Sequence, residues 1–274
     1  MSIALPFSSP DLANVSNRQR VAWSSGDYAV VGSRIHSVSE RLTDDADLHA
    51  GWRVLDIATG SGNAAIAAAR LGCEVVGVDY VPELLDRARE RTAAERLAVE
   101  LIEADAQSLP FPRGAFDAAV SVFGVMFAAD QARAAGELLR VVRPGGTIAL
   151  ASWRRSSFVG EVFDVVASHV TPAPGAPSPF AWGSETDLRL LIGAGVRYLQ
   201  LRERTFTFRD RTPELLVDML RRSYGPTVRA FEAVGSGGRP ALESDLLTLV
   251  RRHNRADDAV AIPSTYLEAI GVRR

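Results

Sequence analysis

Two apolar segments on either side of a glycine turn constrain the fold of this chain more than any other feature. Residues 54–57 run directly into a turn that contains Gly60 and Gly62, and residues 75–78 are followed at once by Asp79. An apolar run, a glycine turn, a helix and a second apolar run ending in an acid are typical of a strand–helix–strand unit that binds a nucleotide-like ligand. The separation of Gly60 from Asp79 matches the roughly 20 residues of such units. The carboxylate of Asp79 is then placed to accept hydrogen bonds from a ribose.

The turn departs from the dinucleotide-binding fingerprint. That fingerprint has a third glycine for close packing of helix on strand, and here Ala65 occupies its place. Asp56 ends the first apolar run immediately before the turn, where its charge would repel a pyrophosphate. The same charge favours a ligand that carries an ammonium or a sulfonium group. A dinucleotide-dependent oxidoreductase stays an open alternative on this evidence.

With this acid before the turn, residues 56–62 resemble motif I of the class I S-adenosylmethionine-dependent methyltransferases, D-x-G-x-G-x-G, with Ala58 in the place of its first glycine. Asp79, residues 103–111 and residues 140–146 resemble three further family segments in the same order. The resemblance covers about residues 50–155 and points to the small-molecule branch that includes the ubiquinone and menaquinone biosynthesis methyltransferases. It implies that S-adenosyl-L-methionine is the cofactor.

The resemblance implies a set of cofactor-binding residues at the ends of successive strands. Asp56 is expected to orient the turn and to offer charge to the amino group of the cofactor, Asp79 to bind the ribose, and Asp105 to accept from the adenine amine. An ordinary turn or a surface acid is the alternative in each case. The other candidates are Ala58, Thr59, Gly60, Gly62, Asn63, Tyr80, Ala106, Gln107, Ser121, Phe123 and Tyr28.

Aromatic and apolar residues near the predicted crevice indicate where a methyl acceptor would lie. The candidates are Trp23 on the N-terminal helices, Met126 and Phe127 after the fourth strand, and Trp153 at the end of the fifth strand. Packing in the core explains each of them equally well. His36 is the candidate general base because an imidazole titrates near neutrality, with a solvated helix histidine as the alternative.

The turn after the fourth strand lacks the polar and proline residues of amino-methylating nucleic-acid enzymes and the acidic cluster of a metal-dependent catechol enzyme. We therefore expect no metal and a small, apolar or aromatic metabolite as the acceptor. A protein that binds S-adenosylmethionine without catalysis is a further alternative, because no general base is evident.

The alternation of apolar runs with helical patterns predicts an α/β fold with a doubly wound, mostly parallel seven-stranded sheet. Strands are expected at 53–57, 74–78, 99–102, 115–122, 147–153, 197–208 and 265–272, and a helix at about 27–42. Residues 1–43 form the predicted N-terminal helical lid, and residues 44–274 the methyltransferase domain. Within that domain, residues 212–258 are expected to be a helical insertion before the last strand, and residues 171–179 a loop.

Charge and composition narrow the class of partner. The formal net charge is -2, which gives no basic excess for nucleic acid and no polybasic run for an anionic membrane. No stretch reaches the roughly 18 apolar residues of a membrane span, and no signal peptide is evident. Cys73 is the single cysteine, so no intrachain disulfide is possible. We expect a cytoplasmic monomer or homodimer.

Overall fold

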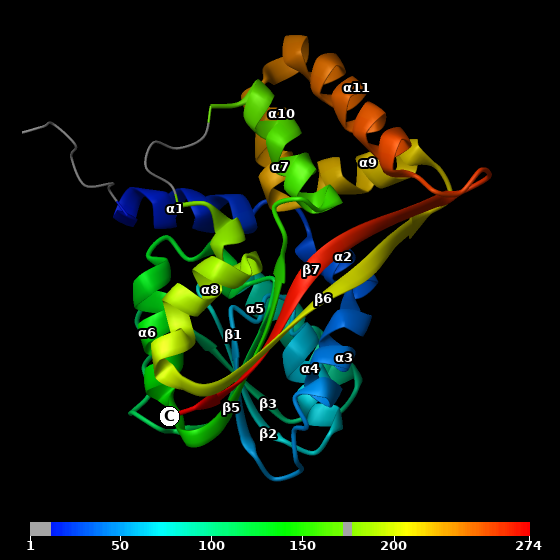
Figure 1. The fold of residues 1–274 in the computed structure, drawn as a ribbon. Coiled ribbons are helices and arrows are strands. Elements are labelled where there is room, and N and C mark those ends of the chain that lie inside the picture. Colours follow the sequence, from blue (N-terminus) through cyan, green and yellow to red (C-terminus); the bar gives the residue numbers. More distant parts are fainter. Residues whose placement is uncertain (1–11, 172–176) are drawn as a thin grey trace, which may run out of the picture.

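The computed structural model describes residues 12–171 and 177–274, which form a central sheet with helices on both faces (Figure 1). The loop expected at 171–179 falls largely outside the described residues, as do residues 1–11 of the predicted lid. The seven strands are β1 Arg53–Ile57, β2 Glu74–Asp79, β3 Val99–Glu103, β4 Phe116–Val122, β5 Val142–Trp153, β6 Val196–Asp210 and β7 Val260–Arg273.

The strand order is β3-β2-β1-β4-β5-β7-β6, and β7 runs antiparallel to both of its neighbours. The prediction of a doubly wound, mostly parallel sheet with an antiparallel strand inserted near its edge is confirmed. Because the order reverses between β1 and β4, a crevice is expected where the carboxyl ends of these two strands diverge. This is the point at which the glycine turn leaves β1.

Helices α3 and α4 cover one face of the sheet and α6 and α8 the other, while α7, α9, α10 and α11 gather beyond one end of it (Figure 1). The α-helices are α1 Leu12–Trp23, α2 Tyr28–Arg34, α3 His36–Asp45, α4 Asn63–Arg70, α5 Pro82–Ala94, α6 Gln131–Val141, α7 Phe158–His169, α8 Glu185–Ile192, α9 Pro213–Ser223, α10 Gly225–Ala233 and α11 Gly235–His253. The short 3-10 helices are η1 Val125–Phe127, η2 Pro179–Gly183 and η3 Gly193–Gly195.

Burial on both faces explains the continuous apolar run of β1. This strand lies between β2 and β4, and the side chains of Val54, Leu55 and Ile57 are fully buried. A strand covered on both sides gains from an apolar residue at every position rather than at alternate ones. Asp56 is the one acid in this strand, and it is buried as well.

The helices differ from the prediction in their division and number. The helix expected over 27–42 is divided at Ile35 into α2 and α3, and Asp27 caps the first of these by accepting a hydrogen bond from the Ala29 N–H. The sequence patterns did not predict α7 and α8, whose N-caps are Ser157 and Ser184. The helical block predicted over residues 212–258 is divided into α9, α10 and α11, and the glycines of residues 235–238 lie in the first turn of α11.

Helix α3, the last helix before β1, packs into the hydrophobic core. Val38 and Leu42 of α3 are buried in the main hydrophobic cluster, where α3 packs against α4. The lid predicted over residues 1–43 stays a prediction. Of its described helices, α1 contacts α10 and α2 contacts α9. At this junction a Cβ on Gly26 would lie 2.9 Å from the Arg222 carbonyl oxygen, so the glycine permits close packing.

Candidate active site

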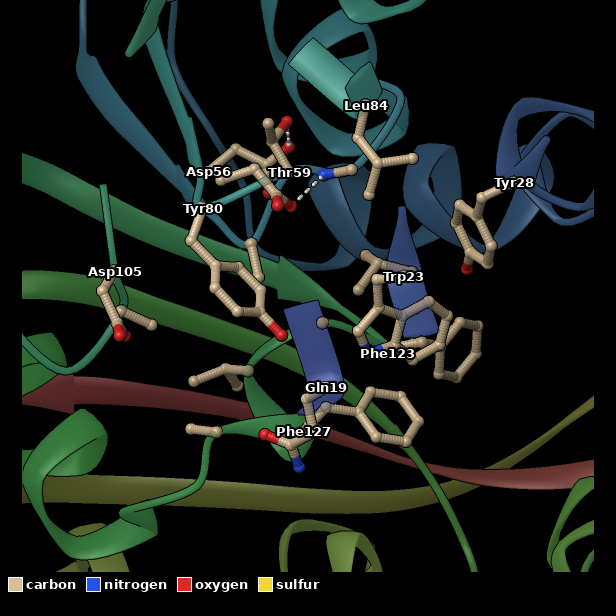
Figure 2. A pocket seen from close by; sticks show the side chains of 18 of the residues that line it. Gln19, Trp23, Tyr28, Asp56, Thr59, Tyr80, Leu84, Asp105, Phe123 and Phe127 are labelled. Carbon is tan, nitrogen blue, oxygen red and sulfur yellow. Dashed lines mark hydrogen bonds between the residues drawn. The ribbon is translucent and has the colours of Figure 1, made fainter. Parts of the chain in front are cut away.

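A cavity opens where β1 and β4 diverge, as the strand order predicts. It encloses about 890 Å³ of space, part of which is open to solvent. Acidic and polar residues from the strand ends form one side, and aromatic residues of α1, α2 and the segment after β4 form the other (Figure 2). Residues of the lining include Gln19, Trp23, Tyr28, Asp56, Ala58, Thr59, Gly60, Asn63, Asp79, Tyr80, Leu84, Asp105, Ala106, Gln107, Phe123 and Phe127.

Asp56 holds the glycine turn in its conformation. One carboxylate oxygen accepts hydrogen bonds from the Thr59 hydroxyl at 2.5 Å and from the Ala65 N–H at 2.8 Å. Ala58, which lies between Asp56 and Thr59 in the chain, adopts a left-handed backbone with φ 54°. That conformation is strained for any residue with a Cβ, which explains why the family pattern has glycine at this position.

Asp79 secures the other side of the same turn. Its two oxygens accept from the Gly60 N–H at 2.9 Å and from the Val81 N–H at 3.0 Å. Gly60 also has a left-handed backbone, with φ 56°, and a Cβ there would lie 3.7 Å from the Tyr28 ring. The bare backbone of the turn therefore faces the cavity directly.

The segment after β3 completes the polar side. Asp105 accepts hydrogen bonds from the backbone N–H and the side-chain amide of Gln107, at 2.8 and 2.9 Å. The Gln107 side-chain oxygen in turn accepts from the Asp130 N–H at the start of α6. Asp105 and Tyr80 lie at the far end of the cavity from Tyr28 (Figure 2). A planar group placed there would meet a carboxylate and backbone amides, and Arg133 lies nearby, where it donates to the Gln107 carbonyl at 2.7 Å.

The two acids nearest the turn are buried without a cationic partner among the described residues. Burial raises the pKa of Asp56 to about 7 and that of Asp79 to about 6, against the hydrogen bonds that lower both. Buried carboxylates are normally paired, because losing water disfavours the charged form. A positively charged ligand in this cavity would restore both to the ionised form.

A second cavity lies beside the first and is almost entirely apolar. It encloses about 520 Å³ and shares Trp23, Tyr28, Ile35, Phe123 and Phe127 with the first cavity. The rest of its lining comes from β5, β6, α2, α7, α9 and the residue after α9, namely Val31, Trp153, Phe158, Val159, Val162, Phe208, Leu216, Leu220 and Tyr224. We call this space the apolar chamber.

Phe123 stands between the two cavities. Its backbone is left-handed, with φ 56°, and its ring stacks on Trp153 with centroids 3.8 Å apart and planes 4° from parallel. A bulky residue in this conformation is uncommon, and such strain clusters at functional sites. The strained turn places the ring where it contacts both spaces.

The structure corrects three of the predicted contacts. The Ser121 hydroxyl donates to the Ile57 carbonyl and accepts from the Val125 N–H, so it ties β4 to β1 and does not line the cavity. Met126 is fully buried in the core and lines neither space. Gly62 is the left-handed N-cap of α4, where a Cβ would lie 3.2 Å from the Ala88 Cβ, and it does not belong to the lining of the cavity.

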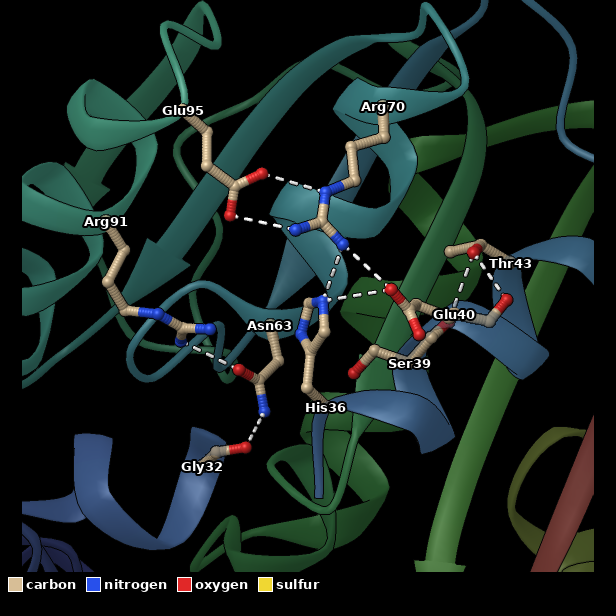
Figure 3. Close-up of polar contacts among 9 residues, drawn as sticks. All are labelled: Gly32, His36, Ser39, Glu40, Thr43, Asn63, Arg70, Arg91 and Glu95. Atoms are coloured by element: carbon tan, nitrogen blue, oxygen red, sulfur yellow. Dashed lines mark hydrogen bonds and ion pairs between the residues drawn. The ribbon is translucent and has the colours of Figure 1, made fainter. Parts of the chain in front are cut away.

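His36 is not positioned as a base at either cavity. It begins α3, and its Nε2 lies 2.9 Å from Arg70 and 3.4 Å from Glu40 (Figure 3). Burial lowers its pKa, with the Glu40 charge acting in the opposite direction. This histidine is partly buried and lines neither cavity.

The same region links the N-terminal helices to the glycine turn (Figure 3). Arg91 of α5 donates to the Ser61 carbonyl at 2.6 Å and to the Asn63 side-chain oxygen at 2.7 Å. Asn63 donates in turn to the Gly32 carbonyl of α2 at 2.8 Å. The turn and the helix that carries Tyr28 are therefore held by one chain of hydrogen bonds.

Sequence reasoning missed most of the apolar chamber. Phe158, Phe208, Leu220 and Tyr224 come from elements beyond residue 155, where no motif marks them. Their apolar character alone is equally consistent with packing, and only the fold brings them together. Within the described ranges, no three His, Cys, Asp or Glu side chains are close enough to hold a metal ion. None of the helices in that part of the chain has the length and apolar character needed to cross a membrane.

Two acids hold a glycine turn at the switch point of a doubly wound sheet, and the antiparallel strand β7 lies between β5 and β6. This combination defines an enzyme of the methyltransferase class. Residues 55–150 match the methyltransferase domain family. An uncharacterized protein of Mycobacterium tuberculosis is 37% identical over 230 residues, which cover 82% of this chain and 84% of the relative. The demethylmenaquinone methyltransferase of Deinococcus radiodurans is 35% identical over 181 residues, 65% of this chain and 69% of that protein.

The fold agrees with these matches. The crystal structure of the YcgJ protein from Bacillus subtilis superposes with a TM-score of 0.59 at 19% identity, covering 87% of this chain and 99% of the other. The chain belongs to the class I S-adenosylmethionine-dependent methyltransferases, and S-adenosyl-L-methionine is its cofactor. The prediction of this family and this cofactor is confirmed, and the oxidoreductase alternative is not supported.

Proposed function

We propose that this methyltransferase transfers the methyl group to a small, apolar or aromatic metabolite held in the apolar chamber. The observation that carries the proposal is the pairing of two adjoining cavities, one with buried acids and one lined by aromatic and aliphatic side chains. A cationic cofactor suits the first, and an uncharged acceptor suits the second. The shared residues then lie between cofactor and acceptor.

The proposal gives specific roles to several residues that line the first cavity. Asp56 orients the turn and balances the positive charge of the methionine part, while Gly60 leaves its backbone open to that part. Asp79 accepts from the ribose hydroxyls, and Asp105 with the Ala106 amide reads the adenine edge. The cofactor supplies an activated methyl group. Ala58, Thr59, Asn63, Tyr80, Gln107, Phe123 and Tyr28 complete the lining on the cofactor side.

The acceptor residues in the proposal are Trp23, Phe127 and Trp153, of which the first two line both cavities and the third lines the apolar chamber. These rings exclude water from the point of transfer and hold the acceptor in line with the methyl group, which is how proximity accelerates a displacement. The Deinococcus relative is named for a small-molecule acceptor, demethylmenaquinone, which agrees with an acceptor site of this kind.

Helices α1 and α2 act as a cover in this proposal, together with α9 and α10, against which they pack. Trp23 ends α1 and Tyr28 begins α2, so the cover supplies part of both linings. In the proposal, opening of this cover admits the acceptor. Gly26, which lies between the two helices, packs closely against the end of α9.

Two measurements test the proposal. S-adenosylhomocysteine, but not NAD, should raise the melting temperature of the purified chain, because a ligand that binds the folded state stabilises it. Transfer of labelled methyl from S-adenosylmethionine should then be found with apolar quinols and phenols and not with polar amines or amino acids. Stabilisation by NAD alone would contradict the cofactor assignment, and transfer confined to polar amines would contradict the acceptor class.

A further inference from the structure

The side chains that line the apolar chamber carry few polar groups. These are two tyrosine hydroxyls and the indole nitrogens of its tryptophans. Tyr28, at the start of α2, lines both cavities, and Tyr224, after α9, lines the apolar chamber. Their ring centroids are 6.4 Å apart, and each ring also packs edge-on against Trp23, at 5.5 and 5.6 Å. Two phenols from segments almost 200 residues apart therefore meet at one end of an otherwise apolar space.

Neither hydroxyl has a hydrogen-bond partner among the described residues. Tyr224 is only 8% exposed, and the exposed part of Tyr28 faces the cavities. Neither hydroxyl belongs to the fully buried polar atoms that lack a partner, so each is open to the cavity that its ring lines. A phenylalanine at each position would fill the same space without offering a hydrogen bond to a ligand there. The hydroxyls are explained if a ligand satisfies them.

We infer that Tyr28 and Tyr224 hold the oxygen of an aromatic hydroxyl compound, a phenol or quinol, and thereby set the specificity of the acceptor site. This inference rests on the proposed function and narrows its acceptor class. Tyr28 lies at the boundary of the two cavities, beside the bare backbone of Gly60. The oxygen bound there is held at the end of the chamber that faces the cofactor, while the rest of the ring lies among Phe127, Phe208 and Trp153.

The roles of the two tyrosines are those of hydrogen-bonding and positioning groups. Burial raises the pKa of both hydroxyls above the ordinary value, so each stays protonated at neutral pH and can donate as well as accept. A site built to hydrogen-bond a hydroxyl discriminates strongly against an analogue that lacks it, because its own buried groups are then left unpaired. The apolar chamber is therefore expected to reject a plain hydrocarbon of the same shape.

Equilibrium dialysis with 2-naphthol and naphthalene tests this, in the presence of saturating S-adenosylhomocysteine. The wild-type chain should bind 2-naphthol about tenfold more tightly than naphthalene, a ratio expected from one or two hydrogen bonds. Tyr28→Phe and Tyr224→Phe should each reduce this ratio at least threefold, with naphthalene affinity and melting temperature unchanged. Tyr198→Phe, at an exposed tyrosine of β6, is the matched control and should change nothing.

Equal binding of the two probes by the wild-type chain would overturn the inference, and so would binding of neither. Retention of the full preference in both phenylalanine variants would overturn it as well. The wild-type ratio is informative even if a variant fails to fold. Failure of S-adenosylhomocysteine itself to bind would count against the proposed function, so the two failures can be distinguished.

Discussion

Replacement of Asp79 by alanine should separate a cofactor site from a merely structural acid. In the proposal, the carboxylate accepts hydrogen bonds from two ribose hydroxyls, and bonds to a charged group are worth about 1.5–3 kcal/mol each. Loss of one alone weakens binding about tenfold, and loss of both weakens it a hundredfold or more. We therefore expect the Kd for S-adenosylhomocysteine to rise at least about tenfold in Asp79→Ala.

The same substitution should change stability much less than affinity, because two effects oppose each other. The variant loses the bonds from the Gly60 and Val81 amides, which cost about 1.5–3 kcal/mol each as bonds to a charged acceptor. It also removes a carboxylate whose pKa is raised from 3.8 to about 6 in the folded chain. Above pH 6 that shift lowers the free energy of unfolding of the wild type by about 3 kcal/mol, which the variant regains. The net loss in the free energy of unfolding is therefore about 3 kcal/mol at most.

Calorimetric titration with S-adenosylhomocysteine at pH 7.5 measures the affinity, and urea unfolding measures the stability. Asp86→Ala is the control, since Asp86 lies on the neighbouring helix α5, is exposed and pairs with Arg89. It should leave both quantities unchanged. An Asp79→Ala variant that is folded and binds within threefold of the wild type would refute the assignment of Asp79 to the ribose.

Three further outcomes are expected. Because the pKa of Asp56 is about 7 in the folded chain and 3.8 in an unfolded chain, the folded state binds more protons in between, so stability should fall as pH rises from 4 to 7. Asp56→Asn should reduce that fall by about 3 kcal/mol in urea unfolding at pH 4.5 and 8, and an unchanged profile would exclude Asp56 as its source. Gly60→Val should abolish cofactor binding in calorimetry while the fold persists. The reason is that valine disfavours φ 56° and that its side chain enters the cavity. Normal binding by this variant would show that the turn has only a structural role. Arg91→Met should weaken cofactor binding about tenfold by releasing Asn63 from the turn, whereas Arg89→Met on the same helix should not, and equal effects of the two would rule out the hydrogen-bond chain.

The cofactor side of the site could be predicted from the sequence because its parts are local. A turn that must bring bare backbone to a ligand needs glycine or a small residue at fixed positions, and a strand end presents the next side chain to the crevice. Asp56, Gly60, Asp79 and Asp105 follow from such patterns, and all four line the cavity. The alternation of strand and helix likewise determines the layers, since both depend on local periodicity.

Residues whose role depends on side-chain direction could not be predicted in this way. Ser121 follows β4 as a cofactor contact would, yet its hydroxyl turns to the Ile57 carbonyl. His36 has a suitable intrinsic pKa, but α3 packs on α4 and directs its ring to Arg70. In both cases a nearby partner determines where the side chain points, and that partner is 64 or 34 residues away in the chain.

The sequence by itself therefore determined the sheet, the glycine turn and the acids around it, since each is encoded within a few consecutive residues. The tertiary structure alone decided the apolar chamber, which draws Trp23, Tyr28, Trp153, Phe208 and Tyr224 from five separate elements and connections. Removal from water favours an apolar side chain both in a core and along a cavity wall. Its pattern in the chain cannot distinguish the two, and only the packing of helices beyond the sheet leaves this space open.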